Sequence, residues 1–182
     1  MNKMPKNIIK FGAYDTRRNL PSKTGRRRGE TLFLSAFIRA FTSDSGAKYI
    51  VGRQFAMPDC GVADCIAVRN WDIPYGSRKK PHVIAFETKL SDWKKAMAQA
   101  YRYRYYADES VVVVPPQVAR IALKNRHLFE EVGVGLWTFD PDSYAIQHRV
   151  SPKKTSPLSN RKRKQALSRI ERRSTNLRKI SK

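Results

Sequence analysis

Four consecutive valines at residues 111–114 constrain the fold more than any other stretch of the sequence. β-branched side chains favour extended backbone, and an apolar run without polar alternation is typical of a strand that is covered on both faces. The run lies between two segments with helical patterns, residues 92–106 and residues 116–132. A strand, a helix and then a buried strand indicate a right-handed crossover, so the sequence predicts an α/β fold with a mixed sheet flanked by helices.

The other hydrophobic patterns predict the order of the remaining elements. Apolar residues recur every three or four positions from Glu30 to Phe41, which predicts a helix. Runs rich in β-branched and aromatic residues, bounded by turn residues, predict strands. The expected order is helix, three strands, helix, strand, helix and a closing hairpin. The segments are residues 30–41, 48–55, 61–68, 82–90, 92–106, 110–115, 116–132 and 133–150, with a turn at 57–61 between the first two strands.

Charge divides the chain into three parts. The formal net charge is +22, and residues 1–29 hold nine basic and one acidic residue, residues 151–182 twelve and one, and residues 30–150 sixteen and thirteen. We therefore expect a basic N-terminal arm, a nearly balanced domain over 30–150, and a disordered basic C-terminal tail. Clustered Lys and Arg neutralise phosphates and release counterions, so nucleic acid is the expected partner. The expected contacts from the arms are Arg26, Arg27, Arg28, Arg161, Lys162, Arg163 and Lys164.

Other partners and compartments fit the sequence less well. The C-terminal tail has few large apolar residues, which makes attachment to an anionic membrane surface a weak alternative. The first ten residues do not resemble a signal peptide, and the valine run is far too short to span a bilayer, so we expect a cytoplasmic, intracellular protein. Cys60 and Cys65 form no disulfide framework, and the histidines have no metal-ligand spacing. Buried free thiols are therefore expected rather than structural zinc.

Two predicted strands carry charged residues among apolar ones. Asp64 is in phase with residues that would face the core, where a carboxylate costs several kcal/mol unless a partner or a metal compensates it. Glu87 and Lys89 are two positions apart and point to the same side of their strand. If the two strands are neighbours, two carboxylates and a lysine converge at one end of the sheet. Carboxylate oxygens bind Mg²⁺, and a nearby lysine can position a water molecule and stabilise developing negative charge.

The spacing of these residues resembles that of a known family. Asp64 is followed, after 22 residues, by the triplet Glu87-Thr88-Lys89 on a strand that leads into a helix. This pattern is similar to the active-site signature of the PD-(D/E)XK nuclease superfamily, and the expected element order resembles its restriction-endonuclease-like core, αβββαβ. The resemblance implies a Mg²⁺- or Mn²⁺-dependent nuclease in which Asp64 and Glu87 bind the metal and Lys89 assists the attacking water.

Two further features of that superfamily have counterparts here. Glu30 opens the first predicted helix, where many members carry an additional acidic metal ligand, although a first-turn glutamate is also favoured by the helix dipole alone. Gln99 and Tyr103 are similar to the Q-x-x-x-Y pattern of RecB-like and phage exonuclease-like members. They belong to a basic and aromatic stripe that either holds a DNA strand or packs at the margin of the core. The stripe comprises Lys95, Gln99, Arg102, Tyr103 and Tyr106.

The aspartate of the signature is ambiguous. The literal Pro-Asp pair is Pro58-Asp59 in the predicted turn, whereas Asp64 follows an alanine. We favour Asp64 because an aspartate in a sheet is held opposite Glu87 more rigidly than an aspartate in a turn. Asp59 and Asp72 are the alternatives.

The resemblance favours a DNA phosphodiesterase with a role in DNA repair, recombination or restriction. A nucleic-acid-binding accessory protein that uses the same fold without cleavage is the main alternative, and an RNA-associated basic protein is a third. Endonuclease and exonuclease activity, and duplex, single-stranded and branched substrates, all stay open. A homodimer is compatible with the sequence, because many members of the superfamily dimerise to cut two strands.

Overall fold

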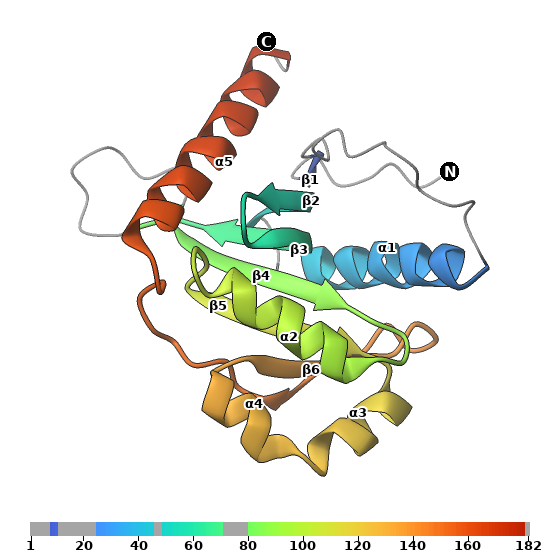
Figure 1. The fold of residues 1–182 in the computed structure, drawn as a ribbon. Coiled ribbons are helices and arrows are strands. Elements are labelled where there is room, and N and C mark those ends of the chain that lie inside the picture. The colour runs from blue at the N-terminus through green and yellow to red at the C-terminus, as the bar shows by residue number, and fades with distance from the viewer. Residues whose placement is uncertain (1–7, 11–24, 46–48, 71–79, 181–182) are drawn as a thin grey trace.

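A seven-stranded mixed β-sheet forms the centre of the described part of the computed structural model, with its strands in chain order (Figure 1). The structure describes residues 8–10, 25–45, 49–70 and 80–180, with the side chains of residues 29–44, 49–70 and 80–172. The strands are β1 (Ile8–Lys10), β2 (Tyr49–Met57), β3 (Gly61–Arg69), β4 (His82–Thr88), β5 (Glu109–Val114), β6 (Gly135–Phe139) and β7 (Ile146–Val150). The helices are α1 (Gly25–Ser45), α2 (Trp93–Tyr103), α3 (Pro116–Leu123), α4 (Arg126–Val132) and α5 (Asn160–Ile180).

The direction of the strands follows from the length of their connections. β2, β3 and β4 are antiparallel neighbours, whereas β4, β5 and β6 are parallel. The short β2–β3 turn contains Asp59 and Gly61 with φ of +62° and +86°, a region that glycine adopts without strain. This confirms the predicted turn. α2 supplies the longer crossover that a parallel β4–β5 pair requires.

Helices cover both faces of the sheet. On one face α1 packs its phenylalanines on the strands, and the Phe37 ring centroid lies 5.3 Å from that of Phe86. On the other face α2, α3 and α4 contribute to a second buried cluster. Val111 and Val113 belong to the first cluster and Val112 and Val114 to the second. The valine run is therefore buried on both faces, as the sequence predicts.

The helices and strands differ from the expected ones in several places, and α2 ends at Tyr103 rather than at residue 106. α1 begins at Gly25, within the segment expected to be an arm. The predicted helix over 116–132 is interrupted at Asn125, whose φ of −118° and ψ of 35° are not helical. Asparagine has a low helix propensity, which is consistent with a break at this position. β1, three residues long, pairs in parallel with β2 and is too short to give a recognisable pattern.

The expectation of a disordered C-terminal tail is wrong for residues 160–180, which form α5. Ala166 and Ile170 are both 0% exposed and belong to the same buried cluster as Phe55. These two residues are four positions apart, so they share one face of the helix. The many basic residues around them conceal this short apolar stripe in the composition. Among the described helices, including α5, none combines the length and the apolar character needed to cross a membrane.

The packing of α5 predicts that the tail contributes to stability. Ile170→Ala removes a fully buried side chain and is expected to lower the free energy of unfolding by about 2–4 kcal/mol. Gln165→Ala, on the exposed face of the same helix, is the matched control and is expected to change it by less than about 0.5 kcal/mol. Urea denaturation measures both. Equal effects of the two substitutions would show that α5 does not pack on the core.

Candidate active site

The structure brings Asp64, Glu87 and Lys89 together where β3 begins and β4 ends. Cys65 pairs with Phe86 in the antiparallel ladder, so the next residue on each strand, Asp64 and Glu87, lies opposite the other. Lys89 directly follows β4, and its Nζ lies 3.2 Å from Glu87 Oε1. The strand register thus places two carboxylates and one ammonium group in a single cluster.

Glu87 is a buried acid in the middle of the sheet. Its side chain is 1% exposed, and β3 and β5 flank it on either side. Burial raises the pKa of Glu87 from an ordinary 4.5 to about 7, and the Asp64 carboxylate adds to this shift. The Lys89 ammonium and the Tyr103 hydroxyl act in the opposite direction. The folded protein therefore holds a carboxyl group that changes its charge near neutral pH.

Tyr103 positions the Glu87 carboxyl group rather than contacting DNA. Its ring is 0% exposed, which corrects the expectation that it lines a DNA-binding stripe. Its hydroxyl lies 2.6 Å from Glu87 Oε2 and 2.7 Å from the carbonyl oxygen of Val62. A phenol has one proton and two acceptors here, so it can donate to Val62 and accept from Glu87 when that acid is protonated. Burial, followed by the Glu87 charge, raises the pKa of Tyr103, which stays protonated.

Asp64 is held by the middle residue of the Glu-x-Lys triplet. The backbone N–H and the hydroxyl of Thr88 both donate to Asp64 Oδ2, each at 2.8 Å. The sequence alone places Thr88 on the face opposite Glu87 and does not predict this role. Gln54, which faces Asp64 from β2 between the pairs Arg53–Cys65 and Phe55–Ala63, has a φ of +53°. This left-handed conformation distorts the ladder beside the site.

Lys89 remains an ammonium at neutral pH. Burial disfavours its charge, but the carboxylates of Glu87, Asp64 and Glu30 outweigh burial and raise the pKa of Lys89 above its ordinary value. Glu30 lies in the second turn of α1. A Cβ atom on the neighbouring Gly29 would lie 3.2 Å from Leu90 Cδ1, so α1 approaches the segment that follows β4.

The donor chemistry of the cluster fits a hard divalent cation. Asp64 Oδ1 receives no hydrogen bond from the described residues, because Thr88 uses Oδ2. Within the described ranges no group of three or more His, Cys, Asp or Glu side chains is close enough to hold a metal ion. Two carboxylates suit Mg²⁺ or Mn²⁺, which keep several water ligands. They do not suit a structural zinc site, which requires four protein ligands.

The alternative aspartates do not join this cluster. Asp59 has a side chain that is 82% exposed and forms an ion pair with Lys162 Nζ at 2.6 Å. The hydrogen bond and charge of Lys162, together with the positive charge of Arg161, lower the pKa of Asp59. Asp72 lies outside the described residues. Of the described candidates, Asp64 is thus the aspartate beside Glu87.

The residues predicted to hold DNA on α2 separate into exposed and buried ones. Lys95 and Arg102 are exposed, whereas Tyr106 is 0% exposed. Gln99 is half-buried, and its Oε1 is buried without a hydrogen-bond partner among the described residues. A Cβ atom on Gly61 would lie 3.7 Å from Arg102 Nη2, so the Arg102 guanidinium lies against the start of β3. A basic group therefore adjoins the strand that carries Asp64.

Two exposed tyrosines near Arg102 were not predicted from the sequence. Tyr101 is 39% exposed and Tyr105 is 40% exposed. Tyr101 and Tyr105 are four positions apart, as are Gln99 and Tyr103. The spacing alone therefore does not tell which pair is exposed to solvent. Exposed aromatic rings can stack on nucleic-acid bases.

The basic residues at the start of α5 also have different roles. Lys162 is 8% exposed and donates to Pro58 O at 2.9 Å as well as to Asp59. Arg163 forms an ion pair with Asp108 at 2.7 Å. These contacts correct the expectation that Lys162 and Arg163 bind nucleic acid, since both attach α5 to the domain. Arg161 and Lys164 are exposed, and the side chains of residues 26–28 lie outside the described ones.

The raised pKa of Glu87 predicts a pH-dependent stability. The folded state retains the Glu87 proton up to about pH 7, whereas the unfolded chain releases it near 4.5. Stability should therefore fall as the pH rises through this interval. Relative to Glu87→Gln, wild type is expected to lose on the order of 3 kcal/mol between pH 4 and pH 8, measured by urea denaturation. Glu131→Gln, which removes an exposed carboxylate on α4, is the control. A constant difference across this range would contradict the prediction.

Comparison with family models, curated proteins and solved structures found no match to this chain. The features that bear on function are the register that sets Asp64 opposite Glu87, the Lys89 ammonium beside them, and the hydrogen bonds from Thr88 and Tyr103.

Proposed function

We propose that this chain is a metal-dependent nuclease that hydrolyses phosphodiester bonds in DNA. The observation that carries the proposal is the cluster of Asp64, Glu87 and Lys89 on neighbouring strands. The observed order of α1, three antiparallel strands, α2 and β5 supports it, because the restriction-endonuclease-like core has the same order. We also propose an intracellular location, where DNA is an abundant polyanion.

The carboxylates of Asp64 and Glu87 would hold Mg²⁺ or Mn²⁺, and Asp64 Oδ1 is the carboxylate oxygen that receives no hydrogen bond from the described residues. The bound ion would neutralise charge on the scissile phosphate and lower the pKa of a coordinated water molecule. The two carboxylates are preorganised for this task, because Thr88 fixes Asp64 and Tyr103 fixes Glu87. Glu30, near the cluster, is available as an additional acidic group.

Lys89 acts as a cation and not as a base in this proposal. Its raised pKa keeps the ammonium protonated, so it can donate hydrogen bonds to the attacking water and to a phosphate oxygen. Negative charge increases on the phosphate oxygens during hydrolysis, and a fixed ammonium stabilises that charge more in the reaction's transition state than in the substrate. The 3.2 Å contact with Glu87 fixes the position of Lys89 before substrate binds.

Exposed basic residues on α2 and α5 support DNA as the substrate. Lys95 and Arg102 lie on α2, and Arg161 and Lys164 lie on α5, all exposed. Arg102 lies against the start of β3, so a backbone phosphate bound there would be close to the strand that carries Asp64. Phosphate contacts of this kind position a nucleic acid without reading its sequence.

Substitutions in the cluster test the catalytic proposal. Asp64→Asn, Glu87→Gln and Lys89→Ala are each expected to lower Mg²⁺-dependent DNA cleavage by about a hundredfold or more, because the first two remove a carboxylate that would hold the metal and the third removes the ammonium that stabilises the developing negative charge. Asp59→Asn, which changes the rival aspartate, is expected to keep the wild-type rate. A panel of linear, circular, nicked, flapped and four-way-junction DNA measures cleavage and identifies the preferred substrate.

A binding readout separates a nuclease from a protein that only binds DNA. Mg²⁺ is expected to raise the melting temperature of wild type and not that of Glu87→Gln. If wild type and Lys89→Ala give the same cleavage, the catalytic assignment is wrong. DNA binding without metal-dependent stabilisation or cleavage would instead favour the accessory-protein alternative.

The outer face of α5 generates a separate prediction on salt dependence. Arg161→Ala/Lys164→Ala removes two exposed cations and is expected to reduce the slope of log affinity for duplex DNA against log salt by about two. Lys124→Ala, an exposed cation between α3 and α4, is the control and is expected to leave the slope unchanged. Fluorescence anisotropy at several salt concentrations measures the slope. The same slope in the double variant and in wild type would exclude α5 from the DNA-binding surface.

A further inference from the structure

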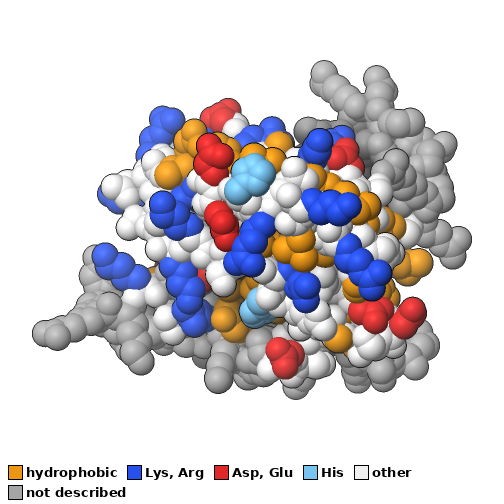
Figure 2. All heavy atoms as spheres, turned by 90° about the horizontal axis from the view of Figure 1, so that it is seen from below, with side chains coloured by type: hydrophobic (Ala, Val, Ile, Leu, Met, Phe, Trp, Pro, Cys, Tyr) orange, Lys and Arg blue, Asp and Glu red, His pale blue; other side chains and the backbone are white. Residues whose placement is uncertain are grey.

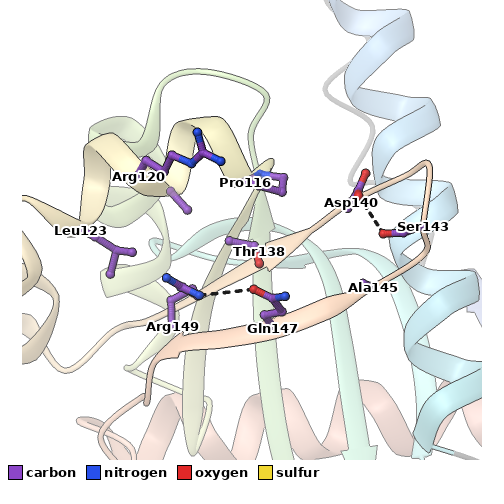
Figure 3. A pocket seen from close by; sticks show the side chains of 10 residues that line it. Pro116, Arg120, Leu123, Thr138, Asp140, Ser143, Ala145, Gln147 and Arg149 are labelled. Atoms are coloured by element: carbon purple, nitrogen blue, oxygen red, sulfur yellow. Dashed lines mark hydrogen bonds between the residues drawn. The ribbon is translucent and has the colours of Figure 1, made fainter.

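A second concave site lies between α3 and the β6–β7 hairpin. The side of the molecule that carries α3 and α4, seen from below in Figure 2, bears Lys and Arg side chains among hydrophobic ones, with fewer acidic ones. A pocket of about 350 Å³ opens between Arg120 of α3, Thr138 of β6 and Arg149 of β7 (Figure 3). This volume lies within the range of small-ligand sites, roughly 300–1,000 Å³. None of the residues of the proposed catalytic cluster lines it.

The two arginines supply positive charge that no carboxylate in the described part neutralises. Arg120 and Arg149 are both exposed and come from opposite walls of the pocket (Figure 3). Arg149 Nη1 donates to Gln147 Oε1 at 3.3 Å, and Arg120 forms no hydrogen bond or ion pair with the described residues. Both guanidinium groups therefore keep donors for an anion, and their planar geometry suits the oxygens of a phosphate group.

The carboxylate that lines the pocket, Asp140, already accepts hydrogen bonds within the hairpin turn. Asp140 accepts hydrogen bonds from the Ser143 hydroxyl at 2.7 Å and from the Asp142 backbone N–H at 3.1 Å. These bonds, first of all the one from Ser143, lower the pKa of Asp140. Figure 3 shows Asp140 directed toward Ser143 in the hairpin turn and away from Arg149. It therefore does not compete with a ligand for the arginines.

The rest of the lining suits a flat, partly apolar ring. Pro116, Ala119 and Leu123 form an apolar wall on α3. Thr138 and the Gln147 side chain stand opposite, paired across β6 and β7, and offer a hydroxyl and an amide. An aromatic base could pack on the apolar wall while its polar edge meets these groups.

We propose that this pocket binds a nucleotide, with Arg120 and Arg149 on its phosphate and the base between α3 and the hairpin. The inference goes beyond the proposed cleavage reaction and does not depend on it. The pocket lies at the same edge of the sheet as Lys89: Thr88 pairs with Val113, and the next residue of β5, Val114, pairs with Thr138. With strands about 4.8 Å apart, β6 is about 10 Å from β4. The ligand is either a free nucleoside monophosphate or the phosphorylated end of a DNA strand.

Calorimetric titration with deoxyadenosine monophosphate tests the proposal. Arg120→Ala and Arg149→Ala are each expected to weaken binding about tenfold, because each removes a charged hydrogen-bond donor. Lys124→Ala, which removes an exposed cation at the end of α3 that does not line the pocket, is the matched control and is expected to bind like wild type. Melting temperatures verify that the variants are folded.

Further titrations separate the sources of the ligand. The ligand is a strand end if a DNA strand with a 5′-phosphate binds more tightly than its 5′-hydroxyl counterpart. This preference should be present only when Arg120 and Arg149 are both present. Tight binding of the free nucleotide without that preference identifies a nucleoside monophosphate. Lys89→Ala is expected to bind as wild type does, even where cleavage is lost. Three outcomes would each overturn the proposal: no binding at millimolar nucleotide, binding of inorganic phosphate as tight as that of the nucleotide, or an equal loss of nucleotide affinity in Lys124→Ala.

Discussion

The burial of the Glu87 carboxyl group is the constraint on which the rest of the site depends. A carboxylate inside a central strand is unfavourable without compensation, and the neighbouring Asp64 makes its ionisation harder. The Tyr103 hydroxyl and the Lys89 ammonium provide that compensation, and both are buried enough to keep fixed positions. β3, β4 and α2 must therefore pack in one particular arrangement for Glu87 to be tolerated. The same arrangement leaves Asp64 Oδ1 without a hydrogen bond from the described residues.

Much of the fold follows from short-range patterns in the sequence. Alternation within strands and the uninterrupted valine run correctly predict the central strands and the helix layers on both faces. The grouping of Asp64, Glu87 and Lys89 also follows, because it requires only the side-chain alternation of two strands and their adjacency. Thr88 is different. Its side chain alternates away from Glu87, and its hydrogen bond to Asp64 reaches across to the neighbouring strand, which the periodicity of a single strand does not encode.

The remaining differences arise where a residue's role depends on a distant partner. Lys162 and Arg163 look like solvated tail residues, yet their partners Asp59 and Asp108 are far away in the chain. Composition therefore assigns both to a disordered segment. The helical pattern around α2 likewise does not predict the exposure of each side chain. It gives the direction of a side chain but not which other elements cover it. Tyr103 and Tyr106 lie beneath other elements, whereas Tyr101 and Tyr105 reach the surface.

The attachment of α5 links the basic charge of the chain to its folding. Since Ala166 and Ile170 are part of the core, α5 cannot detach without exposing apolar surface. A polyanion that binds the outer face of α5 would thus bind the folded state preferentially and stabilise the whole domain by mass action. Substituting the basic residues of α5 one by one would therefore affect both the stability of the fold and the contacts with nucleic acid. Changes at Lys162 or Arg163 would reduce the folded population, and the resulting loss of affinity would not report a lost contact with nucleic acid.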